Sequence, residues 1–181
     1  MNAILKVDLK YAEEHQENVI ECLECSDDTL KLKTLELLHT MTNKDNVEAI
    51  TEKMLEHLQF APKNSKIRKN LVKKIYLSVE KFSPSKRWFV KIMNKLYEMG
   101  ADLITQDISN KFINVVCEQE AESSSHKFRE SIIKINKKVL KKTHNIPDSH
   151  MKVLAYMLGE YVPVTSDTER AKEILGLLCD A

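Results

Sequence analysis

Glycine and proline are scarce in this chain, which has three glycines and four prolines in 181 residues. A β-sandwich or an α/β sheet needs many tight turns and glycine-rich loops, whereas helices joined by short polar turns do not. The sequence also lacks an unbroken apolar run near the roughly 20 residues that a membrane-spanning helix requires. Its N-terminus has no apolar core of a signal peptide. We therefore expect an all-α protein of the cytosol.

The chain also lacks an excess of either charge, because it has 28 Lys and Arg and 27 Asp and Glu. Such a balance leaves no global field to steer the protein onto nucleic acid or a membrane, so any charge argument must be local. The sequence contains no glycine-rich phosphate loop, no paired carboxylates in an apolar setting and no nucleophile motif. We expect neither an enzyme nor a bound cofactor.

Cysteine is too sparse for a metal site. Cys22 and Cys25 form one CxxC pair, but no second CxxC or HxxxH lies nearby to complete four ligands. Cys117 and Cys179 are isolated in the sequence. We interpret both as small reduced core residues in a cytosolic compartment, with no metal bound.

Histidine is scattered in the same way, and we interpret its side chains as polar surface residues. The residues concerned are His39, His57, His126, His144 and His150. His144 and His150 flank Pro147 in a predicted loop, but a metal site needs three or four converging ligands. Trp88 is expected to anchor a helix interface in the core, with a recognition hot spot as the alternative.

Hydrophobic periodicity predicts a series of amphipathic helices. The segment 18–58 contains two of them, and the second carries the stripe Val47, Ile50, Met54 and Leu58. Further helices are predicted over 12–23, 65–82, 84–100, 107–118, 126–143, 148–162 and 168–179. The expected start and stop signals are Ser26 or Asp27, Asn43 or Asn46, Ser65, Pro84 in a first turn, Gly100 as a C-cap, and Asp148 or Ser149. The serine-rich stretch 119–125 is predicted to be an exposed, flexible or regulated loop.

Helical hairpins are predicted to begin near Ser26, Ser65, Thr105 and Asp148. Their spacing of roughly 40 residues lies in the range of HEAT and armadillo repeats. One hairpin, such as the one predicted over 18–58, cannot bury both of its apolar stripes and needs similar neighbours on either side. We predict an α-solenoid of about four helical hairpins, forming a single segment over 1–181, in preference to a closed bundle.

Lysines gather on the polar faces of two predicted helices. They are Lys127, Lys134, Lys138 and Lys141 on the later helix and Lys66, Lys69 and Lys73 on the earlier one. One interpretation is a solvated face opposite the core stripe. The other is a surface for an acidic partner, either anionic lipid headgroups at about 1 kcal/mol per well-placed lysine or nucleic-acid phosphate. Aromatic residues are not interleaved with these lysines, which weakens the nucleic-acid version.

The stretch EKFSPSKRWFVKIMNKLYEMGAD at 80–102 resembles the middle of the trunk of adaptins, the large chains of clathrin-adaptor-type complexes. In that family a Glu-Lys-aromatic-small-Pro run precedes Trp-Phe, Met-Asn and a glycine-terminated helix. Thr-Leu-Glu-Leu-Leu at 34–38 and Leu-Gly-Glu-Tyr at 158–161 are also similar to the family. Within this family, the sequence resembles the epsilon chain of the fourth adaptor complex. The sequence departs from the family at Lys31-Leu32, where a Lys-Arg doublet is common, and at Ala101, where a second glycine is common.

The resemblance implies a structural function as a segment of a longer chain. Large adaptor chains form helical solenoids that hold a small sigma chain and pair with a medium mu chain and a second, beta-type large chain. Arf-type GTPases bring the assembled tetramer to trans-Golgi or endosomal membranes, where it associates peripherally and selects cargo for vesicles. The alternative is a helical-repeat module that binds nucleic acid or nuclear-transport cargo through the lysine-rich faces.

Overall fold

The computed structural model describes residues 16–117, 126–142, 145–163 and 168–180. All regular elements in these ranges are helical. The predictions made for the N-terminal lead-in, the 119–125 loop and His144 lie outside the described residues. The chain divides into two compact units, Met1–Pro84 and Ser85–Ala181, and we describe each unit by itself.

The first unit contains four α-helices in its described part. They are α2 (Gln16–Glu21), followed by the short 3-10 turn η2 (Cys22–Glu24), α3 (Asp28–Met41), α4 (Val47–Phe60) and α5 (Lys66–Phe82). Helix α2 packs against α3, and α5 packs against both α3 and α4. Leucine, isoleucine and methionine side chains from three helices, including Leu38, Met54 and Ile75, are fully buried between them.

The predicted hairpin over 18–58 is wrong in its pairing, because α4 packs most closely against α5 rather than against α3. The chain reverses between α4 and α5 at Asn64, whose φ of 66° is the left-handed value that asparagine tolerates better than most residues. Arg68 holds this turn, since its Nη1 donates to the carbonyl oxygens of Leu58 and Ala61, each at 3.3 Å. The helix pairs of this unit are therefore α2–α3 and α4–α5, shifted by one helix from the prediction.

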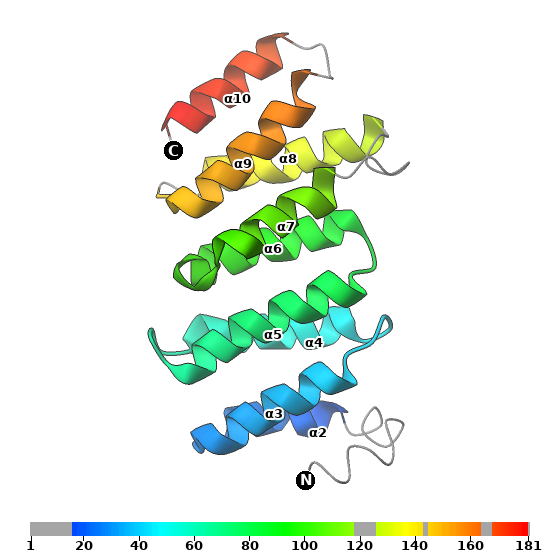
Figure 1. Ribbon diagram of the computed structural model, residues 1–181, viewed down its shortest axis with the longest axis vertical. Coiled ribbons are helices and arrows are strands. Elements are labelled where there is room, and N and C mark those ends of the chain that lie inside the picture. Colours follow the sequence, from blue (N-terminus) through cyan, green and yellow to red (C-terminus); the bar gives the residue numbers. More distant parts are fainter. Residues whose placement is uncertain (1–15, 118–125, 143–144, 164–167, 181) are drawn as a thin grey trace. The chain divides into compact units, whose positions relative to one another are not determined.

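In its described residues, the second unit has two further helix pairs and one more helix, which Figure 1 labels α6 to α10. Their bounds are α6 (Lys86–Gly100), the 3-10 turn η3 (Ala101–Leu103), α7 (Gln106–Cys117), α8 (His126–Lys142), α9 (Asp148–Tyr161) and α10 (Thr168–Asp180). Helix α6 pairs with α7 and α8 pairs with α9, while α6 contacts α8 and α7 contacts α9 between the pairs. Helix α10 packs on α8 and α9. This repeated pairing confirms the predicted all-α, HEAT- or armadillo-like fold. The hairpin predicted to begin near Thr105 is wrong in its pairing, because α7 pairs with α6 and α8 pairs with α9.

Polar side chains cap α3 and α5 at the predicted positions. Asp27 Oδ1 accepts hydrogen bonds from the backbone amides of Thr29 at 2.7 Å and Leu30 at 3.3 Å, at the start of α3. Ser65 accepts from the Arg68 amide at 3.1 Å. These bonds satisfy amides of the first turn that have no partner inside the helix.

Two predicted helix starts need correction. Pro84 lies before the N-cap rather than in the first turn, because the Ser85 hydroxyl accepts from the Trp88 amide at 3.2 Å and takes the cap position. Helix α9 begins at Asp148, and the cap position before it is held by Pro147 rather than by a side chain of Asp148. A carboxylate in the first turn is still favourable there, because the helix dipole is positive at that end. Helix α6 does end at Gly100 as predicted, but with φ of −146° rather than a left-handed C-cap.

The burial of one residue near the C-terminus also differs from the prediction. Cys179 is exposed rather than part of the core as predicted, and Leu175 of the same helix is 61% exposed although it is a large hydrophobic residue. Helix α10 lies on one side against α8 and α9, so that Ile174 is the residue buried on it. None of the described helices combines the length and the apolar character needed to cross a membrane.

Candidate interaction surface

A chain of buried polar groups fixes α6, α8 and α9 in register. His150 of α9 is 1% exposed, and its ring stacks on that of Tyr97 with the centroids 4.4 Å apart and the planes at 10°. The Nε2 atom of His150 lies 3.0 Å from Asn94 Oδ1 on α6. Asn94 Nδ2 in turn donates to Asn136 Oδ1 of α8 at 3.1 Å. Buried polar groups that find such partners specify one packing arrangement.

The prediction of His150 as a polar surface residue is wrong. A signal was present in the sequence, because His150 lies three and four residues before Val153 and Leu154 on the apolar stripe of α9. Burial lowers the pKa of His150 to about 4, so the ring is neutral near neutral pH. Asn94 Oδ1 is then an acceptor, which indicates that Nε2 of the neutral ring carries the proton and donates it.

Two hydroxyl groups connect α7 to the same block of helices. The Tyr97 hydroxyl on α6 lies 2.7 Å from Ser109 Oγ on α7. The Tyr161 hydroxyl on α9 donates to the carbonyl oxygen of Val116 at 2.6 Å. Because all four helices share hydrogen bonds in the interior, the surface residues that they carry keep fixed positions relative to one another.

Helices α6 and α8 concentrate the positive charge of the second unit. Together they carry eleven Lys and Arg but two Glu, although the whole chain has a formal net charge of +1. Six exposed cations define what we call the α6–α8 basic face. They are Arg87, Lys91 and Lys95 on α6 and Lys127, Lys134 and Lys138 on α8.

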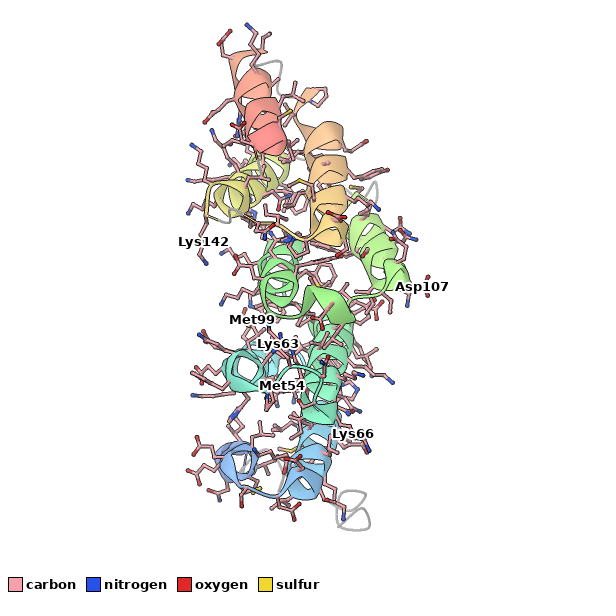
Figure 2. All side chains as sticks on the ribbon, turned by 90° about the vertical axis from the view of Figure 1, so that its left-hand side faces the viewer. Met54, Lys63, Lys66, Met99, Asp107 and Lys142 are labelled. Atoms are coloured by element: carbon pink, nitrogen blue, oxygen red, sulfur yellow. The ribbon has the colours of Figure 1, made fainter. Side chains whose placement is uncertain are left out.

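The two helices of the basic face run side by side in the same direction. Near their beginnings, Arg87 Nη2 of α6 donates to the Lys127 carbonyl oxygen of α8 at 3.4 Å. Near their ends, Lys142 Nζ of α8 lies 3.6 Å from Glu98 Oε2 of α6. Figure 2 views both helices nearly end-on, with Lys142 projecting outward from the last turn of α8.

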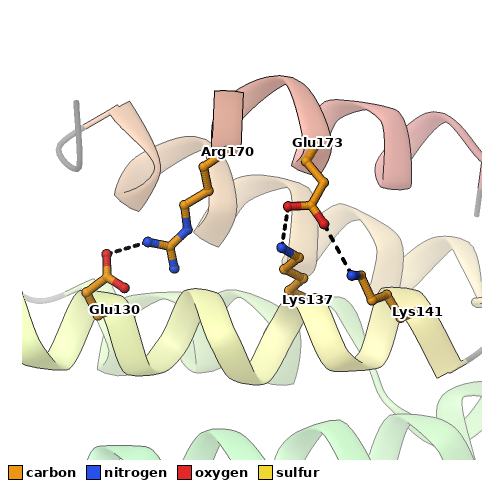
Figure 3. A network of polar contacts seen from close by, with 5 residues as sticks. All are labelled: Glu130, Lys137, Lys141, Arg170 and Glu173. Atoms are coloured by element: carbon orange, nitrogen blue, oxygen red, sulfur yellow. Dashed lines mark hydrogen bonds and ion pairs between the residues drawn. The ribbon is translucent and has the colours of Figure 1, made fainter. Parts of the chain in front are cut away.

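Helix α10 contacts α8 through one carboxylate, Glu173, and one guanidinium, Arg170 (Figure 3). Glu173 accepts hydrogen bonds from Lys137 and forms an ion pair with Lys141, whose Nζ is 3.2 Å from Oε1. The hydrogen bonds from Lys137 and Lys141 hold the pKa of Glu173 below its ordinary value. Arg170 Nη1 donates to Glu130 Oε1 at 2.6 Å. One carboxylate on a neighbouring helix therefore spans two lysines one turn apart on α8.

The structure separates the lysines predicted to meet an acidic partner into three groups. Lys127, Lys134 and Lys138 are exposed on α8, and no carboxylate of the described residues forms an ion pair with them. Lys141 contacts Glu173 and so belongs partly to the contact with α10. The remaining three, Lys66, Lys69 and Lys73, are exposed on α5 of the first unit. Sequence reasoning missed the α6 cations, although Arg87, Lys91 and Lys95 recur at four-residue spacing.

No group of three or more His, Cys, Asp and Glu within the described ranges is placed to hold a metal ion. Cys22 and Cys25 are half-buried free thiols whose Sγ atoms point to the backbone carbonyls of Asn18 and Asp27. The polar features that the structure does assemble are thus an interior hydrogen-bonded chain and an outer basic face. Neither arrangement carries a nucleophile paired with a base.

Stacked helix pairs with a fixed polar surface define the chain as an α-helical repeat protein. The profile of the family described as the adaptin N terminal region matches residues 1–180. The chain is 32% identical to the AP-4 complex subunit epsilon of Arabidopsis thaliana, over 99% of this chain and 19% of that protein. It is also 32% identical to the human AP-4 complex subunit epsilon-1, over 97% of this chain and 15% of that protein.

A more distant relative is the AP-2 complex subunit alpha-1 of Arabidopsis thaliana, with 30% identity over 81% of this chain and 14% of that protein. The chain belongs to the adaptin N-terminal region family, and the resemblance to epsilon chains of the fourth adaptor complex is confirmed. It spans less than a fifth of the length of these relatives.

Proposed function

We propose that this chain is a scaffold segment of the large chain of a heterotetrameric vesicle-coat adaptor complex. The observation that carries the proposal is the alignment of 99% and 97% of the chain with AP-4 epsilon subunits of a plant and of human. The helix pairs support it, because stacked pairs present extended surfaces on which other subunits can bind. In this proposal, residues 1–181 form a single segment of an adaptin trunk.

The proposed partners are a small sigma chain, a medium mu chain and a second, beta-type large chain. The complex acts in intracellular protein transport and cargo sorting. It is cytoplasmic and peripheral at trans-Golgi or endosomal membranes, to which an Arf-type GTPase recruits it. The function requires no catalysis, since a scaffold works by holding its partners at fixed distances.

The hydrogen-bonded interior of the second unit supplies the rigidity that this function needs. Asn94, Asn136 and His150 link three helices at distances of 3.0 and 3.1 Å. If the helices of a scaffold slid past one another, its binding surfaces would lose their relative placement. Buried polar groups oppose such sliding, because each group left without a hydrogen-bond partner costs about 1–3 kcal/mol.

The proposal is tested by affinity purification of the tagged chain, carried in its native full-length protein, from the cells that express it. We expect stoichiometric recovery of one small sigma chain, one medium mu chain and one beta-type chain, identified by mass spectrometry. The same tagged protein should co-localise with trans-Golgi or endosomal markers. Recovery of nucleic acid or nuclear-transport cargo, without any sigma or mu chain, would favour the helical-repeat binding module instead and would overturn the coat assignment.

A further inference from the structure

We propose that the α6–α8 basic face is a docking surface for an acidic helical segment of a partner protein. The inference goes beyond the scaffold function, because it assigns a binding chemistry to named residues. It depends on the fixed placement of α6 beside α8 and on the contact that α10 already makes with α8.

The contact of α10 shows which chemistry α8 accepts. Glu173 spans Lys137 and Lys141, which are four residues apart and therefore lie on the same side of α8, one turn from each other. A single carboxylate on an adjacent helix thus satisfies two lysines. The second polar contact, between Arg170 and Glu130, orients α10 along α8.

Lys134 and Lys138 repeat this four-residue spacing on α8. At 100° per residue, this pair is displaced by about 60° around the helix from the pair that Glu173 spans. The displacement is away from α10 and toward α6, because the contact of Lys142 with Glu98 marks the α6 side. The pair therefore lies between two occupied contacts, with both lysines exposed.

Lys91 and Lys95 form a similar pair on α6, also four residues apart and exposed. Two parallel helices in contact lie about 8–10 Å apart, so the two lysine pairs flank a strip that one incoming helix can cover. The cations of α8 extend from Lys127 to Lys138, which is about 16 Å at 1.5 Å per residue. A helix of about three turns, with Glu or Asp every three or four residues, matches that length.

The surface favours a protein partner over a lipid bilayer or a nucleic acid. The large hydrophobic residues exposed in the described ranges are Phe60, Tyr156 and Leu175, and none of them is on α6 or α8. Helices that lie in a membrane interface bury apolar side chains there, and single-stranded nucleic acids stack on aromatic side chains. The basic face offers lysines at helical spacing without either anchor.

The test uses fluorescence anisotropy with the purified chain and a labelled synthetic helical peptide that carries glutamates four residues apart on one face. An isomer of the same composition, with the glutamates scattered around the helix, is the matched probe. We expect the ordered peptide to bind about tenfold more tightly than the isomer, because its glutamates can form several weak ion pairs with the basic face at the same time. Binding should weaken as salt is raised, because the contacts are exposed charges.

The decisive variant is Lys134→Glu with Lys138→Glu, and the control is Lys33→Glu with Lys44→Glu. Both double variants change the net charge equally, and Lys33 and Lys44 are exposed in the first unit. We expect about a tenfold loss of affinity in the first variant and less than a twofold change in the control. Lys134→Arg with Lys138→Arg should keep the binding, and circular dichroism should show the same helix content in all variants.

Three results would overturn the proposal. The first is equal binding of the ordered peptide and its scattered isomer, and the second is an equal loss of affinity in the two charge-reversal variants. Either result would indicate a response to net charge alone. The third result is binding to phosphatidylcholine vesicles that contain phosphatidylserine, or to single-stranded RNA, without binding of the peptide. That outcome would assign the basic face to a membrane or to nucleic acid.

Discussion

Acidification should destabilise the second unit through His150. The imidazole is buried against Tyr97 and within hydrogen-bond distance of Asn94, both on α6. Burial alone lowers its pKa from 6.5 to about 4. In the unfolded chain the same ring takes up a proton near its ordinary pKa. Between the two values the unfolded state binds more protons, so stability falls as the pH falls through this window.

The size of the effect follows from the two pKa values. One pKa unit corresponds to about 1.4 kcal/mol, so the full shift is equivalent to about 3 kcal/mol. Between about pH 7 and about pH 5 the native ring stays largely neutral while the unfolded ring becomes protonated, and this accounts for about 2 kcal/mol of that amount. Carboxylates remain mostly ionised over this range, which keeps their contribution small.

Chemical denaturation followed by the fluorescence of Trp88 measures this loss, because Trp88 is the single tryptophan and lies on α6. The chain should lose about 2 kcal/mol of unfolding free energy from about pH 7 to about pH 5. A His150→Gln variant, although less stable at each pH, should lose much less over the same interval. His126→Gln, at an exposed histidine of α8, is the control and should keep the full pH dependence.

An equal loss in the chain and in the His150→Gln variant would refute the reasoning. It would mean that the buried ring accepts its proton without penalty, for example because water enters the interface between α6 and α9. The test compares how steeply the unfolding free energy of each protein changes with pH. A general destabilisation by the substitution lowers the free energy at every pH and so does not affect this comparison.

Three further substitutions have defined outcomes. Tyr161→Phe removes the donor to the Val116 carbonyl and should cost about 1–2 kcal/mol by Trp88 fluorescence; an unchanged denaturation midpoint would contradict that hydrogen bond. Asp27→Ala removes the cap of α3 and should lower the stability of the first unit by about 1 kcal/mol, measured by denaturation followed by far-UV circular dichroism. An unchanged stability would show that water replaces the lost hydrogen bonds to the amides. Glu173→Gln should leave the denaturation midpoint nearly unchanged, because Glu173 is exposed and solvent screens its ion pairs; a clear drop in the midpoint would show that α10 depends on them.

The extents of the helices were largely predictable from the sequence because each long helix carries its own signals. The helix predicted over 65–82 is observed as Lys66–Phe82, and the one predicted over 126–143 is observed as His126–Lys142. In the first case a serine cap precedes the helix and the Ser-Pro sequence follows it, so both ends are set by residues within a few positions. Local chemistry decides such boundaries, and the sequence displays it directly.

Helix pairing was less predictable, because an apolar stripe shows which face is buried but not which helix covers it. The stripes of α3 and α4 were compatible with a hairpin between them, yet both helices contact α5 more closely. The observed pairing of α4 with α5 is set by the turn at Asn64 and by the hydrogen bonds that Arg68 makes across it. These are features of backbone conformation and side-chain reach, which a hydrophobic period does not encode.

The candidate site was predictable in part for a similar reason. Helical spacing groups Lys127, Lys134, Lys138 and Lys141 on one side of α8, since that grouping is a property of one helix, and their meeting an acidic partner stays a prediction. It did not show that Glu173, more than thirty residues from Lys137 and Lys141, would take up two neighbouring lysines. His150 was wrongly predicted at the surface, because the polarity of histidine was given more weight than its position on the apolar stripe of α9.

The interior and the surface of the second unit have separable roles. Tyr97, Phe112 and Phe128 are fully buried, and the polar atoms of Asn94, Asn136 and His150 are bonded to one another. These buried groups hold the helices together, whereas the lysines of the α6–α8 basic face are solvated and contribute little to the stability of the fold. We therefore expect the fold to tolerate charge reversal on the basic face, so that a change in peptide binding there reports on the surface itself.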